Sequence, residues 1–188
     1  MKTFILASAS PRRSDILSQI RVPFRVEPSS YAEDGRDFLP ADRPLRFAEG
    51  KALDVSRKFP AEYVLGFDTL VFLDGVPLGK PHDAAEALRM LESLNGRSHK
   101  VVSGVALAHG GNLLASDGEE TVVRFRRVSR KELERYVESG EPMDKAGAYA
   151  IQGLGARFVE SIDGCFYNVV GLPVAKTLQL IENLGDLP

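Results

Sequence analysis

The feature of this 188-residue chain that most restricts its fold is the segment from Tyr63 to Leu73. The segment is apolar almost throughout, which is typical of a central strand covered on both faces. Asp68 interrupts it. A carboxylate buried in such a strand is costly unless a cation, a metal or hydrogen bonds compensate for its charge, so Asp68 is a candidate functional residue. The alternative is that the strand ends here and Asp68 begins a turn.

Strand and helix patterns alternate on both sides of this segment. Capping residues and apolar side chains three and four apart predict helices after Ser10, Asp42, Asp83, Ser129 and Leu172. Strands are expected from Phe4 and at 24–27, 99–108, 113–116, 121–126 and 156–163. This alternation predicts an α/β fold with helices around one central sheet. Since no repeat or linker is present, residues 1–188 are expected to form a single domain, whose two lobes share that sheet.

Composition and charge exclude several classes of protein. Lysine and arginine total 24 and aspartate and glutamate total 26, so the net charge of −2 gives no general attraction for a polyanion such as DNA. No stretch approaches the roughly 20 apolar residues that span a membrane, and the first residues do not resemble a secretion signal, so a cytoplasmic protein is expected. A single cysteine and three histidines without ligand spacing argue against a disulfide and a zinc site.

The segment after the first strand, Ala7 to Arg13, is suited to binding an anion. Ser10 has the side-chain oxygen of an N-cap and Pro11 suits the first helical position, so a helix is expected to begin at Pro11. Arg12 and Arg13 then lie in the first turn, where the helix dipole disfavours cations. A bound phosphate would remove this conflict, because N–H groups, hydroxyls and guanidinium groups would all face it. The alternative is that both arginines are solvated surface residues.

Two further charged residues are candidates for the same site. Lys51 borders the buried face of the helix that follows Asp42, although a lysine there can also extend its ammonium to solvent. Residues 29–41 form a polar, acidic loop that includes Glu33. Loops of this length are usually functional or mobile.

The Asp-Gly pair at 74–75 predicts a tight hairpin turn. With these two residues as the loop, the numbers of cross-strand partners sum to 149, so Thr69 faces Lys80. That register brings the Lys80 ammonium beside Asp68. The alternative for Lys80 is a charge on an edge strand that prevents aggregation.

The segment from Glu141 to Gly155 is rich in glycine and small residues. Its glycines let the backbone approach a ligand closely, and Gln152 between them presents one hydrogen-bond acceptor and one donor in a plane. Such an amide can pair with the N3–H and O4 of uracil or thymine. The alternative is an ordinary loop that contains a glutamine.

Taken together, segments from nearly the whole chain resemble the Maf family of nucleoside triphosphate pyrophosphatases. The matching segments are 6–13 (LASASPRR), 51–52 (KA), 68–69 (DT), 79–81 (GKP), 121–125 (TVVRF), 144–153 (DKAGAYAIQG) and 168–173 (NVVGLP). Their number and order make the resemblance specific. Phe67 departs from the small residue that is usual before the Asp-Thr pair, and either narrows the site or only packs.

The resemblance implies a fold like that of inosine triphosphate pyrophosphatases, with a mixed central sheet flanked by helices and a deep cleft between two lobes, and often a homodimer. It implies hydrolysis of a nucleoside triphosphate between its α and β phosphates, which releases a monophosphate and pyrophosphate. Gln152 is typical of the branch that acts on dTTP and UTP. The branch that acts on 7-methyl-GTP carries an acidic residue at this position.

The resemblance also implies roles for individual residues. Asp68 is expected to deprotonate the attacking water, to bind a metal, or to do both through a bound water. Glu33 is the second candidate ligand for Mg²⁺ or Mn²⁺. The triphosphate is expected to contact Ser8, Arg12, Arg13, Lys51 and Lys80. Selectivity for the base is expected from Arg12, Thr69 and Gln152.

Three alternatives stay open at this point. A non-catalytic regulator of septation or cell division would bind nucleotide without releasing a product. A nucleic-acid-binding protein would use the arginines at 12, 13, 124, 126 and 127, although the balanced charge counts against it. An enzyme of the same class would act on CTP or a modified pyrimidine nucleotide instead of dTTP and UTP.

Overall fold

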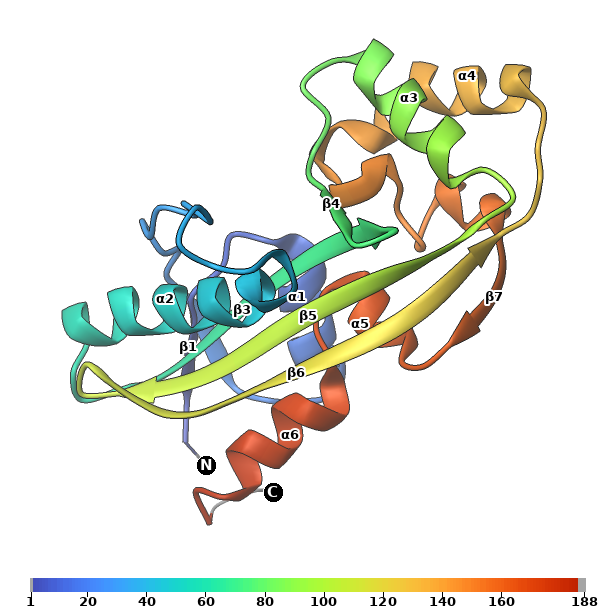
Figure 1. Ribbon diagram of the computed structural model, residues 1–188. Coiled ribbons are helices and arrows are strands. Elements are labelled where there is room, and N and C mark those ends of the chain that lie inside the picture. The colour runs from blue at the N-terminus through green and yellow to red at the C-terminus, as the bar shows by residue number, and fades with distance from the viewer. Residues whose placement is uncertain (1, 186–188) are drawn as a thin grey trace. The chain divides into compact units, whose positions relative to one another are not determined.

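The computed structural model of the protein describes residues 2–185 (Figure 1). The chain forms two compact units, and each is described by itself. Unit 1 consists of residues 2–68, 103–119 and 171–185, and unit 2 consists of residues 69–102 and 120–170. Three long strands contribute residues to both units: β3 (Tyr63–Leu73), β5 (Ser98–His109) and β6 (Asn112–Phe125).

Unit 1 contains a mixed sheet in the order β2-β1-β3-β5-β6. Strands β1 (Phe4–Leu6) and β2 (Phe24–Val26) are short, and β1 pairs in parallel with both β2 and β3. Strand β1 lies between β2 and β3, and the chain passes from β1 to β2 and then across β1 to β3. Right-handed crossovers therefore place the two connecting helices on opposite faces of the sheet.

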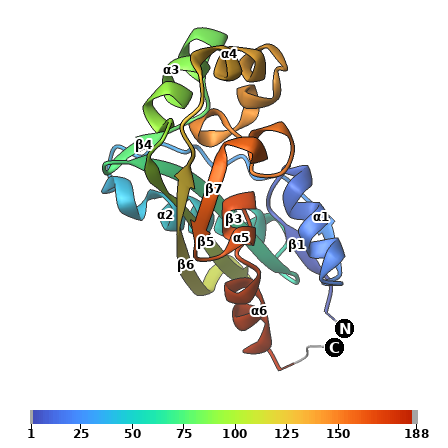
Figure 2. The ribbon, with the colours of Figure 1, turned by 90° about the vertical axis from the view of Figure 1, so that its right-hand side faces the viewer.

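The helices of unit 1 are α1 (Pro11–Gln19), α2 (Arg43–Lys58) and α6 (Val174–Glu182), and a 3₁₀ turn at Pro40–Asp42 precedes α2. Figure 2 shows α1 and α2 on opposite sides of β1 and β3. The buried side chains under α2 form a compact cluster of small and branched apolar residues: Ile5, Ala7, Ala48, Ala52, Val55, Val64, Ala106 and Ala108. Because alternate strand residues point to opposite faces, Phe4 and Leu6 are buried on the other side of β1.

Unit 2 contains the other ends of the long strands, in the order β4-β3-β5-β6-β7. Strands β4 (Val76–Leu78) and β7 (Val159–Asp163) pair antiparallel with β3 and β6. The helices are α3 (Ala84–Leu94), α4 (Arg130–Glu138) and α5 (Phe166–Val170), with 3₁₀ turns at Glu141–Asp144, Ala146–Ala148 and Leu154–Phe158. Its core is aromatic: the Phe125 ring lies 4.8 Å from Tyr149 and 5.9 Å from Phe158, between ring centroids.

The predicted α/β architecture and most of the predicted element boundaries are confirmed. Helices begin at Pro11, Arg43, Ala84, Arg130 and Val174. The Asp83 and Ser129 side chains accept the expected capping bonds from the N–H groups three residues on. The Ser10 and Asp42 side chains make no capping bond to their helices.

The hairpin register is confirmed only for the residues nearest the turn. Leu73 pairs with Val76 and Val71 pairs with Leu78, as the sum of 149 requires. Strand β4 ends at Leu78, so the expected pairing of Thr69 with Lys80 is not made as part of the ladder.

Two predictions of strands are wrong in detail. The strand expected at 156–163 begins only at Val159, because residues 154–158 form a 3₁₀ turn. The strands expected at 113–116 and 121–126 form one continuous strand, β6. The charged residues between them are compatible with a strand because cations neutralise them: Lys176 lies 2.7 Å from Asp117 in unit 1, and Lys100 lies 2.8 Å from Glu120 in unit 2. Within residues 2–185, no helix has both the length and the apolar character needed to cross a bilayer.

Gly66 lets helix α2 pack directly on strand β3. A Cβ atom at this position would lie 2.3 Å from the Ala48 carbonyl oxygen and 2.8 Å from the Ala52 Cβ. We expect Gly66→Ala to lower the free energy of unfolding by about 1–3 kcal/mol, because the helix must move away from the strand. Urea unfolding followed by circular dichroism measures this loss. The matched control is Gly118→Ala, whose new Cβ would meet only an ordinary contact at 3.8 Å; equal midpoints for the two variants would contradict the expectation.

Candidate active site

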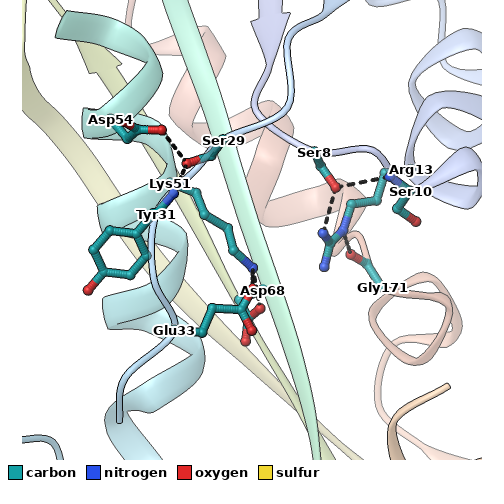
Figure 3. Close-up of polar contacts among 10 residues, drawn as sticks. All are labelled: Ser8, Ser10, Arg13, Ser29, Tyr31, Glu33, Lys51, Asp54, Asp68 and Gly171. Carbon is teal, nitrogen blue, oxygen red and sulfur yellow. Dashed lines mark hydrogen bonds and ion pairs between the residues drawn. The ribbon is translucent and has the colours of Figure 1, made fainter. Parts of the chain in front are cut away.

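Two carboxylates of unit 1 share one ammonium group. Lys51 Nζ, on α2, lies 2.6 Å from Asp68 Oδ1 on β3 and 2.6 Å from Glu33 Oε1 in the loop before α2 (Figure 3). The Lys51 side chain is only 12% exposed, so its ammonium does not extend to solvent. Gly66, two residues before Asp68, allows the close helix–strand contact that brings the two groups together.

Asp68 is a buried carboxylate whose two oxygens differ in their hydrogen bonding. Oδ1 accepts the hydrogen bond from Lys51, whereas Oδ2 is buried and has no hydrogen-bond partner within residues 2–185. Burial raises the pKa of Asp68, and the positive charges of Lys51 and Arg13 act against that rise. A buried acceptor without a partner is costly, so Oδ2 is placed to receive a proton or to bind a cation.

The turn between β1 and α1 places Ser8 and Arg13 together. Ser8 Oγ accepts hydrogen bonds from Arg13 Nη1 at 2.8 Å and from the Ser10 N–H at 3.3 Å, and Arg13 Nε donates to the Gly171 carbonyl at 2.9 Å (Figure 3). Ser8 thus connects the residue before α1 with the Arg13 side chain, whereas the capping bond expected from Ser10 is not made. The Arg13 guanidinium lies 5.9 Å from the centre of the fully buried Phe67 ring, so Phe67 packs beneath it.

The register of the sheet explains why this turn and Asp68 are neighbours. Leu6 pairs with Leu65, so Ser8 and Asp68 both lie just beyond the last pair of the parallel strands. The electrostatic effects agree: burial lowers the pKa of Arg13, the charge of Asp68 raises it, and the charge of Arg12 lowers it. In α/β sheets, ligands bind at the carboxyl ends of strands where the strand order reverses. Here, that place is the end of β1.

The remaining candidates belong to unit 2. Thr69 follows Asp68 in β3 and is partly buried. Lys80 is exposed shortly after β4, and Gln152 is exposed between two 3₁₀ turns. The structure therefore joins Ser8 with Arg13, and Glu33 with Lys51 and Asp68, within unit 1. The association of Lys80 and Gln152 with these groups stays a prediction.

Sequence reasoning missed the residues that hold the Glu33 loop. Asp54 Oδ2 accepts a hydrogen bond from Ser29 Oγ at 2.7 Å (Figure 3). It also accepts one from the Ser30 N–H at 2.8 Å. Tyr31 packs on Gly50, where a Cβ would lie 2.4 Å from the tyrosine ring. Burial alone would raise the pKa of Asp54, but hydrogen bonds from Ser29 and Lys58 lower it to about 2. Asp54 is therefore ionised at neutral pH and anchors the start of the loop.

The two carboxylates fit a hard divalent cation. Asp68 offers the buried Oδ2, which has no partner among the described residues, and the Glu33 side chain is 52% exposed. Mg²⁺ is commonly held by one or two carboxylates together with substrate phosphates and waters. Among the described residues, no group of three His, Cys, Asp or Glu side chains forms a metal site by itself. The donor set therefore suits a metal that arrives with a phosphate.

Comparison with known proteins shows the fold and the family. A HAM1 protein from Coxiella burnetii has a similar solved structure, with a TM-score of 0.50 and 16% sequence identity, over 98% of this chain and 96% of that chain. This likeness shows a shared fold. The family model described as Maf-like protein matches residues 3–184, and the chain belongs to the Maf family.

Curated relatives match nearly the whole chain. The dTTP/UTP pyrophosphatase of Symbiobacterium thermophilum is 50% identical, over 98% of this chain and 95% of the relative. The dTTP/UTP pyrophosphatases of Bacillus pumilus and Pyrococcus furiosus are 43% and 44% identical, over 100% and 97% of this chain and 100% and 95% of those proteins.

Removing the Lys51 ammonium tests its effect on Asp68. We expect Lys51→Met to raise the pKa of Asp68 further, because burial then acts with less opposition from positive charge. Carboxyl-carbon NMR titration of Asp68 in both proteins measures the change. The control is Lys58→Met, which removes an ammonium paired with Asp54 on the same helix. If Asp68 titrates at the same pH in all three proteins, Lys51 does not control its ionisation.

Proposed function

We propose that this protein hydrolyses dTTP and UTP between the α and β phosphates, releasing the monophosphate and pyrophosphate. The observation that carries the proposal is the buried Asp68, with one oxygen bonded to Lys51 and the other without a partner in the described structure. The names of relatives at 43–50% identity over nearly the full chain support the choice of substrates.

Asp68 acts as the general base. Its Oδ2 accepts a proton from a water molecule, whose oxygen forms the new bond to phosphorus while the bond to the bridging oxygen breaks. The electron pair of the broken bond leaves with pyrophosphate. A carboxylate whose pKa is raised by burial is a stronger base than an exposed aspartate, and the positive charges of Lys51 and Arg13 favour its ionised form.

The cations neutralise the charge that develops on the leaving pyrophosphate. Arg13 is held rigidly by Ser8 and Gly171, so its guanidinium needs no reorganisation when charge develops nearby. Lys51 is already oriented by the two carboxylates. In this proposal Arg12 and Lys80 complete the set from the first turn of α1 and the segment after β4.

Glu33 would hold a Mg²⁺ or Mn²⁺ ion directly and Asp68 would hold it through a bound water, with phosphate oxygens and further waters as its other ligands. When bound, the ion supplies charge neutralisation at the reacting phosphates. Lys51 keeps the two carboxylates together before the metal arrives, because its ammonium contacts both.

Selectivity for the base is assigned to Gln152, Thr69 and Arg12. The exposed Gln152 amide can accept a hydrogen bond from N3–H and donate one to O4 of uracil or thymine. A homodimer and a cytoplasmic location belong to the same proposal and stay predictions.

The decisive experiment measures pyrophosphate release from a panel of nucleoside triphosphates with Mg²⁺ or Mn²⁺, before and after chelation of the metal. We expect turnover of UTP and dTTP, and not of 7-methyl-GTP. Asp68→Asn should lower kcat by roughly 10²–10⁴-fold, because the isosteric amide cannot take the proton. The matched control is Asp15→Asn, an exposed position on α1, which should retain full activity.

Other outcomes of this experiment would replace the proposal. Nucleotide binding without any product, with metal present, would favour the non-catalytic regulator of septation. Salt-dependent binding of oligonucleotides without turnover would favour the nucleic-acid-binding alternative. Undiminished turnover by Asp68→Asn would remove Asp68 as the base.

Changing Gln152 to glutamate tests the reading of the base. A carboxylate at this position cannot donate to O4 and places a negative charge beside it. We expect Gln152→Glu to lower kcat/KM for UTP and dTTP by roughly 10–100-fold, as for the loss of a hydrogen bond with an unsatisfied partner. Gln179→Glu, at an exposed position on α6, provides the same change of charge elsewhere. Unchanged selectivity across the panel would show that Gln152 does not contact the base.

A further inference from the structure

The loop that carries Gln152 is held from one side by a single carboxylate. Glu141, which lies just after α4, accepts hydrogen bonds from the Leu154 N–H at Oε2 and from the Gly155 N–H at Oε1, both at 3.0 Å. Both N–H groups follow Gln152 closely in the chain. Glu141 thus fixes the backbone immediately after Gln152.

The hydroxyl of Tyr136 fixes the backbone before Gln152. It donates to Glu141 Oε1 at 2.9 Å and accepts from the Ala150 N–H at 3.1 Å. Two connected side chains therefore hold three backbone N–H groups on both sides of the exposed glutamine. All of these residues lie in unit 2, in the part of the chain that is orange in Figure 1.

Glycines allow the loop to lie directly on this pair of side chains. Gly153 has φ +108°, and a Cβ there would lie 2.7 Å from Glu141 Oε2. A Cβ on Gly155 would lie 2.5 Å from the Ala150 carbonyl oxygen and 2.8 Å from the Tyr136 hydroxyl. Gly153 and Gly155, two of the glycines that suggested close approach to a ligand, thus serve close approach to Glu141 and Tyr136.

The protonation states suit this arrangement at neutral pH. Burial favours the neutral form of Glu141, but the hydrogen bonds from Leu154 and Gly155 outweigh it and lower the pKa of the carboxyl. Burial raises the pKa of Tyr136. Glu141 is therefore an ionised acceptor and Tyr136 a neutral donor, so the bond between them is charge-assisted.

The Gln152 side chain itself is exposed, and its amide has no hydrogen-bond partner within residues 2–185. Among the described residues, the contacts around it therefore fix only the backbone from which the side chain extends. A backbone fixed in advance lowers the ordering cost of binding, and a small displacement of a positioning group can cost a large factor in rate.

We propose that Glu141 and Tyr136 are positioning residues for pyrimidine recognition, which hold the backbone around Gln152 so that its amide meets the N3–H and O4 edge of the base. This inference rests on the proposed function and extends it to residues that do not contact the substrate. The two side chains act through Gln152, so their effect on selectivity must disappear when the Gln152 amide is removed.

The test compares turnover of UTP with turnover of N3-methyl-UTP, which lacks the N3–H. The variants are Glu141→Gln, Tyr136→Phe, Gln152→Ala and the double variant Glu141→Gln with Gln152→Ala. Glu141→Gln keeps the shape of the side chain but turns one acceptor into a donor that faces a backbone N–H. The matched control is Glu138→Gln, an exposed position at the end of α4.

We expect Glu141→Gln and Tyr136→Phe to lower kcat/KM for UTP by roughly 10–100-fold. The preference for UTP over N3-methyl-UTP should fall toward that of Gln152→Ala, while Glu138→Gln behaves as wild type. In the Gln152→Ala background, Glu141→Gln should change this preference no further. Activity is measured at a temperature well below the thermal unfolding midpoint of each variant, which separates this effect from a loss of folded protein.

Each other outcome has a distinct meaning. If Glu141→Gln and Tyr136→Phe lower turnover of both substrates equally, or if the change in preference persists without Gln152, the inference is wrong and the two residues only stabilise the fold. If wild type prefers UTP and both variants keep that preference, the inference is likewise wrong. If wild type hydrolyses neither substrate, the proposed function itself fails.

Discussion

The candidate site depends on the burial of one carboxylate in a central strand. Such a charge needs a cation close by, and the cation must come from an element that packs on that strand. Gly66 and the small residues of α2 let the helix approach closely enough for Lys51 to reach Asp68. A buried ion pair is weak evidence for stability, because desolvation offsets the attraction. Because Oδ2 has no hydrogen-bond partner in the described part of the chain, a chemical role is the better explanation of the pair.

Much of the fold was predictable because its signals are local. Helix starts depend on a few adjacent residues, and the Asp-Gly turn set the register of β3 and β4. The predictions failed where the local structure depends on contacts with residues far away in the sequence. The charged residues 117–120 in the middle of β6 were not expected to form a strand, because their sequence does not reveal that Lys176 and Lys100 neutralise two of their acidic side chains. Residues 156–158 were expected to begin a strand, but they belong to a 3₁₀ turn whose first two N–H groups, at 154 and 155, donate to Glu141.

The sequence also indicated most of the charged residues of the site, because a carboxylate in an apolar run and arginines at a helix start break local rules. The residues that support the loops of Glu33 and Gln152 break no local rule. In the sequence pattern of α2, Asp54 falls on the side expected to be exposed, and its hydrogen-bond partner Ser29 lies 25 positions earlier in the chain. Glu141 is one acidic residue among many, and its partners are backbone N–H groups 13 and 14 positions on. No residue type or spacing marks an acceptor of backbone hydrogen bonds.

These two supports share one physical design. In both the Asp54 support and the Glu141 support, an ionised carboxylate accepts a hydrogen bond from a backbone N–H of the loop. In both, a tyrosine also lies against a glycine at which a Cβ would clash: Tyr31 against Gly50, and Tyr136 against Gly155. Strands and helices fix their own side chains, so Asp68 and Lys51 need no such help. Glu33 and Gln152 lie on loops and are exposed, so their positions are only as precise as the supports beneath them. Under the proposed function, substitutions in the supports would therefore change metal binding or base selectivity while every residue expected to contact the substrate stays the same.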